Sequence, residues 1–156
     1  MSHPLAHETN LVTVYGCLRS PHHGISISME YVSKSLLTAA FANNSTIASN
    51  LSIRERLHIA LGMTKGLNEM HLVQLTHRDF KPENVLLSRL FNGNYMPKVA
   101  DFGVSFQLII TSAKLAKKSR DTADYDAPEV AVDNKIPSVN SHIYALVFTL
   151  SELLPA

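Results

Sequence analysis

The segment of residues 77–84 constrains the fold more than any other part of the chain. This polar segment contains Asp79, Lys81 and Asn84, and a second aspartate, Asp101, follows further along the chain. A carboxylate can orient a hydroxyl group and accept its proton, an ammonium group can bind a phosphate, and amide and carboxylate oxygens can bind Mg²⁺. Because such chemistry takes place at one point, we expect the fold to bring these four side chains together.

The pattern is too specific to be an accident of composition. Eight positions are involved, five in the polar segment and three in the Asp-Phe-Gly triplet at residues 101–103. With a frequency of about 1 in 20 for each residue type, such a set arises by chance on the order of 10⁻¹⁰ times per starting point. A loop with ordinary solvated charges is therefore the weaker interpretation.

The composition is that of one globular domain without a strong charge. The chain has 156 residues, of which 46% are hydrophobic and 17% charged, and its formal net charge is +1 at pH 7. This balance argues against disorder and gives no general attraction to nucleic acid. The single cysteine, Cys17, excludes an internal disulfide. No apolar run is long enough to span a bilayer, so we predict a cytoplasmic or nuclear protein without membrane insertion.

The N-terminal part of the chain predicts a β-hairpin. Residues 11–17 are rich in β-branched and aromatic types, and residues 25–32 alternate apolar and polar side chains. Residues 19–24 contain a proline and a glycine and predict the turn between them. We therefore expect two antiparallel strands, the second of them half-buried. A short helix over residues 35–42 and a polar loop over residues 43–50 are expected to follow.

Two longer helices are predicted, over residues 53–71 and 140–154. Ser52 and Glu55 form a capping-box pattern, in which the hydroxyl accepts an N–H of the first turn and the glutamate reaches back to the cap. Apolar residues recur at helical spacing in both segments, and we expect these stripes to face the core. The first stripe consists of Ile53, Leu57, Ala60, Leu61, Thr64, Leu67 and His71, and the second of Ile143, Leu146, Val147, Leu150, Leu153 and Leu154.

Shorter elements are expected between these helices. The Asn-Gly pair at residues 92–93 indicates a two-residue turn. Residues 109–126 lack a clean period and predict a mobile loop, and residues 127–133 predict a short helix. Extended pieces are expected over residues 73–76, 84–88 and 97–100.

The motifs resemble those of the protein kinase catalytic domain. Residues 77–84 match its catalytic loop, residues 101–103 its magnesium-binding triplet, and residues 127–129 the end of its activation segment. Residues 7–12 look like the turn before the family's fourth strand, and residues 29–32 look like its gatekeeper and hinge. The resemblance covers nearly the whole chain.

This resemblance implies an α+β, protein-kinase-like fold. Residues 1–156 are then a single partial domain, in which residues 1–32 form a remnant of the N-lobe antiparallel sheet and the hinge. Residues 33–156 form a mainly α-helical, truncated C-lobe. The family's glycine-rich loop, its strand-three lysine with the partner glutamate, and its last C-lobe helices have no counterpart in these residues. We therefore expect weak or no catalysis, because positioning supplies most of the rate in phosphoryl transfer.

The resemblance also implies roles for individual residues. ATP and Mg²⁺ are the expected cofactors, and a protein with serine or threonine hydroxyls is the expected substrate. Asp79 is then the catalytic base, Lys81 the catalytic cation on the phosphate, and Asn84 and Asp101 the metal ligands. The expected nucleotide-binding residues are Met29, Glu30, Tyr31, Val32, Lys81 and Leu86.

Three further positions are expected to be regulatory. The resemblance implies that Arg78 receives a phosphorylated residue of the activation loop, and Ser119 and Thr122 are the candidates. Lys81 together with Thr122 follows the serine/threonine pattern of the family. Residues 98–105 are similar to the tyrosine-kinase-like group.

One position departs from the family pattern in a way that affects the polar segment. His142 stands where the family has an aspartate that accepts backbone N–H bonds from the catalytic loop, and a neutral imidazole can still accept one such bond. Two alternatives to an active protein kinase are open. The chain is a pseudokinase-like, non-catalytic binding or scaffold module, or it is an unrelated phosphotransferase or nucleotide-binding protein that shares only the loop.

Overall fold

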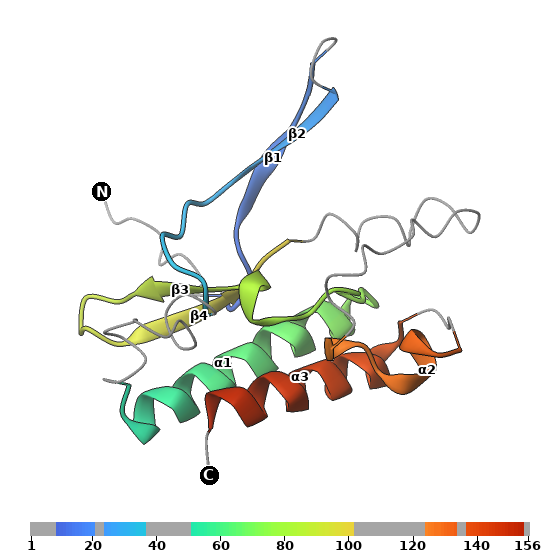
Figure 1. Ribbon diagram of the computed structural model, residues 1–156. Helices are drawn as coiled ribbons and strands as arrows, with labels where there is room; N and C mark the ends of the chain where they lie inside the picture. The colour runs from blue at the N-terminus through green and yellow to red at the C-terminus, as the bar shows by residue number, and fades with distance from the viewer. Residues whose placement is uncertain (1–8, 21–23, 37–50, 102–123, 134–136, 155–156) are drawn as a thin grey trace.

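The computed structural model describes residues 9–20, 24–36, 51–101, 124–133 and 137–154. They form two separate two-stranded antiparallel sheets and three α-helices, so the expected mixture of strands and helices is present (Figure 1). A short 3₁₀ helix, Pro82–Asn84, ends the polar segment. The elements in chain order are β1 (Val14–Ser20), β2 (Gly24–Met29), α1 (Ile53–Leu72), β3 (Val85–Arg89), β4 (Tyr95–Val99), α2 (Pro128–Ala131) and α3 (Val139–Leu153).

Strands β1 and β2 form the predicted antiparallel hairpin, with Cys17 opposite Ile27 and Ser20 opposite Gly24. The prediction that the second strand is half-buried is wrong, because every residue of β2 is exposed. The hairpin stands away from the rest of the molecule, and no described element covers either of its faces (Figure 1). The alternation of side chains therefore indicates a strand here without indicating a buried face.

Helix α1 begins as its sequence predicts. The backbone N–H of Glu55 donates to Ser52 Oγ at 3.3 Å, and the backbone N–H of Ser52 donates to Glu55 Oε2 at 2.8 Å. Both halves of the capping box are thus present, and they satisfy N–H groups that have no partner inside the helix. The helix ends at Leu72, one residue beyond the predicted end.

The buried face of α1 coincides with the predicted stripe only in part. Leu67 is buried and Ala60 packs against the core, but Ile53, Leu57 and Leu61 are exposed over 64%, 54% and 53% of their surface. The stripe has helical spacing but is displaced around the helix, because the face that packs carries two glycines, which let other chain segments approach closely. The buried residues are Ile59, Gly62, Met63, Gly66, Leu67 and Met70.

The chain after α1 turns and then forms the second hairpin. The expected extended piece at residues 73–76 is instead a turn, in which the N–H of Leu75 donates to the carbonyl of Met70 at 2.9 Å. Strands β3 and β4 pair with Leu87 opposite Pro97, close to the predicted positions. Their loop contains the predicted Asn-Gly pair but is longer than two residues, since the N–H of Leu90 donates to the carbonyl of Asn94.

The core lies where α1 packs against β4 on one side and α3 on the other (Figure 1). Arg56 joins the two helices, because its guanidinium donates to the carbonyl of Leu153 at 2.7 Å. The predicted bounds of the last helix are close to those of α3, but Ile143 and Val147 are exposed. The cluster of buried apolar residues consists of Leu36, Leu51, Ile59, Met63, Leu67, Met70, Phe80, Val85, Leu87, Val99, Ala145 and Leu153.

The buried side of α3 is more polar than the sequence predicts. Ser141, His142 and Thr149 are buried together with Ala145 and Leu153. The hydroxyls are satisfied locally, because Thr149 donates to the carbonyl of Ala145 at 2.9 Å and Ser141 to that of Ser138 at 2.8 Å. Such bonds remove the cost of burying a hydroxyl group, so polar residues can occupy a core-facing stripe.

Three predictions lie wholly or largely outside the described residues: the helix over residues 35–42, the loop over residues 43–50, and the loop over residues 109–126. The short helix predicted over residues 127–133 is present as α2. Among the helices in the described part of the chain, none has the length and apolarity that a membrane span requires.

We expect Gly66→Ala to destabilise the fold. An added Cβ would lie 2.6 Å from the carbonyl oxygen of Asn10 and 2.9 Å from Cγ2 of Val99, and a backbone atom cannot move aside easily. Overpacking of this kind costs about 1–3 kcal/mol, whereas alanine in place of glycine gains about 1 kcal/mol in a helix. Chemical denaturation should show a lower free energy of unfolding for Gly66→Ala. The exposed control Asn68→Ala on the same helix should match or exceed the wild type.

Candidate active site

The polar segment is anchored to the end of β4 by His77. This histidine is fully buried, and its Nε2 lies 2.7 Å from the carbonyl oxygen of Ala100. The backbone N–H of Asp79 points at its Nδ1 at 3.3 Å, so the ring accepts at Nδ1 and donates from Nε2. Phe80, also buried, meets the ring edge-on, with centroids 5.9 Å apart. The two ends of the predicted site are therefore joined through one imidazole.

Three of the four predicted catalytic and metal-binding side chains are in contact. Lys81 Nζ lies 3.0 Å from Asp79 Oδ2. The amide nitrogen of Asn84 donates to the backbone carbonyl of Asp79 at 2.8 Å and to Asp79 Oδ2 at 3.2 Å. The amide is thereby oriented, and its carbonyl oxygen is the atom with ligand capacity. The 3₁₀ turn at the end of the segment creates this arrangement, because it folds Asn84 back over Asp79.

Asp101 is brought to the same region by the backbone. The N–H of Ala100 donates to the carbonyl of Asn84 at 2.8 Å, which places Asp101 beside the asparagine. Asp101 is exposed and has a φ of 64°, a left-handed conformation in which the chain leaves the direction of β4. The two oxygen ligands predicted from the sequence are thus held close together by the backbone. Asn84 directly precedes β3, and Asp101 lies just after the end of β4.

Arg78, the predicted phosphate receptor, is the residue through which the polar segment contacts α3. Its backbone N–H donates to His142 Nε2 at 3.0 Å, which confirms that this imidazole accepts a bond from the loop. Its Nε is buried without a hydrogen-bond partner among the described residues. The side chain lines a small pocket together with Tyr125 and Asp126. The candidate phosphorylation sites, Ser119 and Thr122, lie outside the described residues.

The segment that leads into α2 is held on α3 by Tyr125. Its hydroxyl donates to Glu152, with the shorter distance of 3.0 Å to Oε2, and its ring meets Phe148 edge-on. Burial and the Glu152 carboxylate both raise the pKa of Tyr125. The motif at residues 127–129 therefore begins from an anchored position.

The predicted nucleotide-binding residues occupy different environments. Met29 and Tyr31 are exposed, and Val32 is partly buried. Leu86 lies in β3 and is paired with the strand-like segment that follows the hinge, where the N–H of Leu87 donates to the carbonyl of Lys34 at 2.8 Å. The segment that pairs with Leu86 therefore follows directly after residues 29–32.

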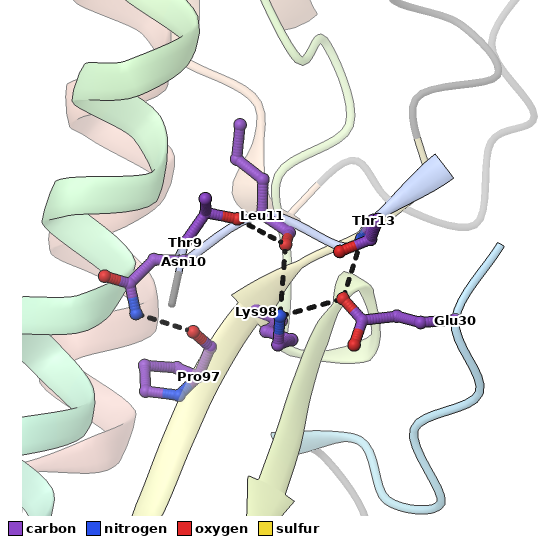
Figure 2. Close-up of polar contacts among 7 residues, drawn as sticks. All are labelled: Thr9, Asn10, Leu11, Thr13, Glu30, Pro97 and Lys98. Atoms are coloured by element: carbon purple, nitrogen blue, oxygen red, sulfur yellow. Dashed lines mark hydrogen bonds and ion pairs between the residues drawn. The ribbon is translucent and has the colours of Figure 1, made fainter. Parts of the chain in front are cut away.

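Glu30 belongs to a polar cluster that the sequence did not reveal (Figure 2). Its Oε1 accepts from Lys98 Nζ at 2.8 Å and from the backbone N–H of Thr13 at 2.7 Å. Lys98 is 6% exposed, and its ammonium also lies 3.5 Å from the carbonyl oxygen of Leu11. A buried ammonium requires such partners, because a charge without them is strongly disfavoured in the interior. The available signal was a lysine inside a strand predicted next to Asp101.

The cluster fastens the chain before β1 onto β4. Asn10 Nδ2 donates to the carbonyl of Pro97 at 2.8 Å (Figure 2). The backbone of Val99 bonds on both sides, donating to the carbonyl of Asn10 at 2.8 Å and accepting from the N–H of Val12 at 2.9 Å. Burial raises the pKa of Glu30, but the hydrogen bonds from Lys98 and Thr13 lower it by more, so this pKa lies below 4.5. Glu30 is therefore a structural tie as well as a residue of the expected hinge.

Comparison with known proteins identifies the family. A family model described as the protein kinase domain matches residues 1–156. The chain belongs to the protein kinase family. The α+β fold expected from the resemblance is accordingly confirmed.

The similar proteins include plant receptor-like kinases and fungal kinases. The chain is 30% identical over 93% of its length to leaf rust 10 disease-resistance locus receptor-like protein kinase-like 1.4 of Arabidopsis thaliana. It is 32% identical over 92% of its length to the MAP kinase kinase MKK1/SSP32 of Saccharomyces cerevisiae. A G-type lectin S-receptor-like serine/threonine-protein kinase of Arabidopsis thaliana is 34% identical over 94% of the chain. The chain spans 21%, 27% and 16% of the lengths of these three relatives.

The stability of the kinase chain should depend on pH through Glu30. Because its folded-state pKa is the lowered one, the ionised carboxylate stabilises the fold fully above about pH 4.5, and this contribution is lost as pH falls through the folded-state pKa. Denaturation at pH 7 should show Glu30→Gln to be less stable than the wild type by about 1.5–3 kcal/mol, the range for hydrogen bonds to a charged group. The difference should shrink below pH 4.5.

The control for this measurement is Glu69→Gln, which removes a carboxylate on α1 outside the cluster. It should show no comparable pH-dependent difference from the wild type. A Glu30→Gln difference that stays constant down to pH 3 would contradict the interpretation of the Glu30–Lys98 pair.

Proposed function

We propose that this chain transfers the γ-phosphoryl group of ATP to a serine or threonine hydroxyl of a protein substrate. The observation that carries the proposal is the convergence of Lys81 and Asn84 on the carboxylate of Asp79. The names of the similar proteins, among them a serine/threonine-protein kinase and a MAP kinase kinase, support the same reaction class. Phosphoryl transfer needs such positioned charges more than it needs covalent chemistry from the protein.

Each residue has a defined task in this proposal. Asp79 orients the substrate hydroxyl and accepts its proton, and the contacts from Lys81 and Asn84 hold its carboxylate in place. The ammonium of Lys81, 3.0 Å from Asp79 Oδ2, would bind the phosphate that is transferred. Asn84 Nδ2 donates to Asp79, so the carbonyl oxygen at the other end of the amide is the atom that can bind a ligand.

The residues present fit a magnesium ion. Asn84 and Asp101 offer an amide oxygen and a carboxylate, which are the hard oxygen ligands that Mg²⁺ takes in nucleotide sites. The hydrogen bond between the backbones of Ala100 and Asn84 keeps these two positions adjacent. Asn84 and Asp101 would hold the ion, which would neutralise part of the charge that develops on the phosphate during transfer. The adenine of ATP is proposed to lie against backbone groups of residues 29–32 and against Leu86.

The proposed domain organisation follows from the same contacts. Residues 1–32 would be the N-lobe remnant and hinge, and residues 33–156 the C-lobe portion. The Glu30–Lys98 ion pair supports this organisation as a contact between the two proposed parts, because it joins the end of the hairpin to the strand that leads to Asp101. Regulation through Arg78 by phosphorylated Ser119 or Thr122 is likewise proposed, supported by the buried Nε of Arg78.

We expect transfer by these 156 residues alone to be slow. They contain neither a glycine-rich loop nor the lysine–glutamate pair that aligns the nucleotide phosphates, and such alignment supplies much of the rate. A non-catalytic, pseudokinase-like binding module is the second candidate. It is favoured by His142, which holds the loop with a neutral ring where the family uses an aspartate.

Nucleotide and metal binding can be tested separately from catalysis. Thermal unfolding of the chain with millimolar ATP and Mg²⁺ should show a higher midpoint than with ATP alone, because a ligand that binds the folded state stabilises it. Asp101→Ala should abolish the magnesium-dependent part of the shift. Glu69→Gln should leave the shift intact. A wild type that shows no shift at all would favour the pseudokinase-like alternative.

Catalysis itself depends on Asp79. Asp79→Asn keeps the shape of the side chain but removes the proton acceptor, so transfer of radiolabelled phosphate to a generic serine/threonine substrate should fall by at least about 100-fold. The magnesium-dependent thermal shift should remain in this variant. Undiminished transfer by Asp79→Asn would rule out the assigned base.

A further inference from the structure

Two histidines form a hydrogen-bonded pair next to the polar segment. His71 lies in the last turn of α1 and His142 near the start of α3, and their ring planes are nearly parallel, at an angle of 18°, with centroids 5.2 Å apart. His71 Nε2 and His142 Nδ1 are 2.9 Å apart. His142 is 2% exposed, and its other nitrogen accepts the backbone N–H of Arg78 at 3.0 Å. The pair thus connects two helices to the residue directly before Asp79.

The contacts permit a single arrangement of protons. A backbone N–H can only donate, so Nε2 of His142 must be without a proton. A neutral imidazole then carries its proton on Nδ1, and this N–H donates to His71 Nε2. His71 Nε2 must accept, which leaves the proton of His71 on its own Nδ1. Both rings are therefore neutral and in the same tautomer.

The bond to Arg78 falls on a strained part of the backbone. Arg78 has a φ of 69°, a left-handed conformation that costs a non-glycine residue energy. The next residue, Asp79, donates its own N–H to His77. The two consecutive N–H groups at this turn are thus both held by imidazole nitrogens, one from the polar segment itself and one from α3.

We propose that His71 and His142 are positioning residues, which as a neutral pair hold the backbone of Arg78 in its left-handed turn and so place Asp79 against Lys81 and Asn84. The catalytic part of this inference rests on the proposed phosphoryl transfer. The structural part does not. His71 does not touch the candidate substrate site, and it acts through His142.

A proton added to either ring breaks the arrangement. Protonated His142 carries an N–H on both ring nitrogens. Its Nε2–H would then point at the N–H of Arg78, and neither group could accept a hydrogen bond. A proton on His71 Nε2 requires His142 to accept at Nδ1, so the proton of His142 moves to Nε2 and meets the same N–H. The other ionisable groups around His142 are His77 and Arg78 from the polar segment and Tyr125 and Asp126 from the segment before α2.

The surroundings keep the pair neutral at neutral pH. Burial, with the nearby rings of His71 and His77, lowers the pKa of His142 to about 3, and burial lowers the pKa of His71 below 6.5. Because both folded-state pKa values are lowered, the stabilisation is complete above about pH 6.5. It is lost as pH falls through the folded-state values. The hold on Arg78 should therefore weaken on acidification.

The tautomers can be observed directly in the wild-type chain. Imidazole ¹⁵N–¹H correlation spectra at pH 7 should show His71 and His142 protonated on Nδ1, and His77 protonated on Nε2. The exposed His58 on α1 serves as the internal reference for a solvent-exposed ring. A spectrum in which His142 carries its proton on Nε2, or is charged, overturns the proposal without any assay of activity.

The hold on the backbone is measured by amide hydrogen exchange at Arg78. His142→Ala should accelerate exchange about fivefold, the factor expected when one hydrogen bond of average strength is lost. His142→Gln keeps a carbonyl acceptor that does not titrate, so it should restore protection and make it independent of pH. In the wild type, protection corrected for intrinsic rate should fall as pH is lowered from 6.5 towards 4. Equal exchange in all three proteins sinks the proposal.

The catalytic consequence has its own readout. His71→Phe keeps an aromatic ring at this position but removes the acceptor, and it should lower kcat for phosphate transfer while leaving the KM for ATP unchanged. His71→Gln should recover most of the loss, and His58→Gln should have no effect. An unchanged kcat in His71→Phe overturns the positioning role. If the wild type transfers no phosphate, the proposed function fails, while the tautomer and exchange results still decide the structural claim.

Discussion

The candidate site depends on the contact between the polar segment and the end of β4. Ala100 makes that contact twice, since its N–H donates to the carbonyl of Asn84 and its carbonyl oxygen lies 2.7 Å from His77 Nε2. Two chain regions more than fifteen residues apart are joined there by one residue. Asp79 and Asn84 come from the first region and Asp101 from the second, so without this contact the four chemical groups would have no common location.

Imidazoles, rather than carboxylates, accept two backbone N–H groups of the polar segment. His77 accepts the N–H of Asp79 and His142 accepts the N–H of Arg78. A carboxylate would make a charge-assisted bond that tolerates added protons nearby, whereas a neutral ring has one acceptor nitrogen and loses it on protonation. The chain therefore combines intact catalytic side chains with a support whose strength depends on proton positions. This combination accounts for both an enzymatic and a non-catalytic reading of the same residues.

The junction between the β1–β2 hairpin and β4 is stabilised by an ion pair and not by neutral rings. The Glu30–Lys98 pair is largely removed from solvent and lies where the hairpin joins β4. Removing either partner leaves a poorly solvated charge, which is more costly than the pair is favourable. The carboxylate of Glu30 is thus committed to an internal contact.

Local patterns were sufficient for much of this structure. The capping box of Ser52 and Glu55, the two hairpins and the helices near residues 127–133 and 140–154 were all predictable, because each depends on neighbours in the chain. The motif residues of the polar segment were also recognisable, and Asp79, Lys81 and Asn84 do meet. Their short separation along the chain makes that contact a local matter as well.

From the amino-acid sequence alone, the type of most elements and the chemical groups of the site could be predicted, although residues 73–76 form a turn and not an extended segment. Tertiary structure decided which faces are buried, because burial depends on what packs against an element. The stripe of Ile53, Leu57 and Leu61 has helical spacing yet remains exposed, while Gly62 and Gly66 mark the true contact face. Lys98 pairs with Glu30, which is 68 positions away in the chain, and His71 pairs with His142, which is 71 positions away. No local pattern records such contacts.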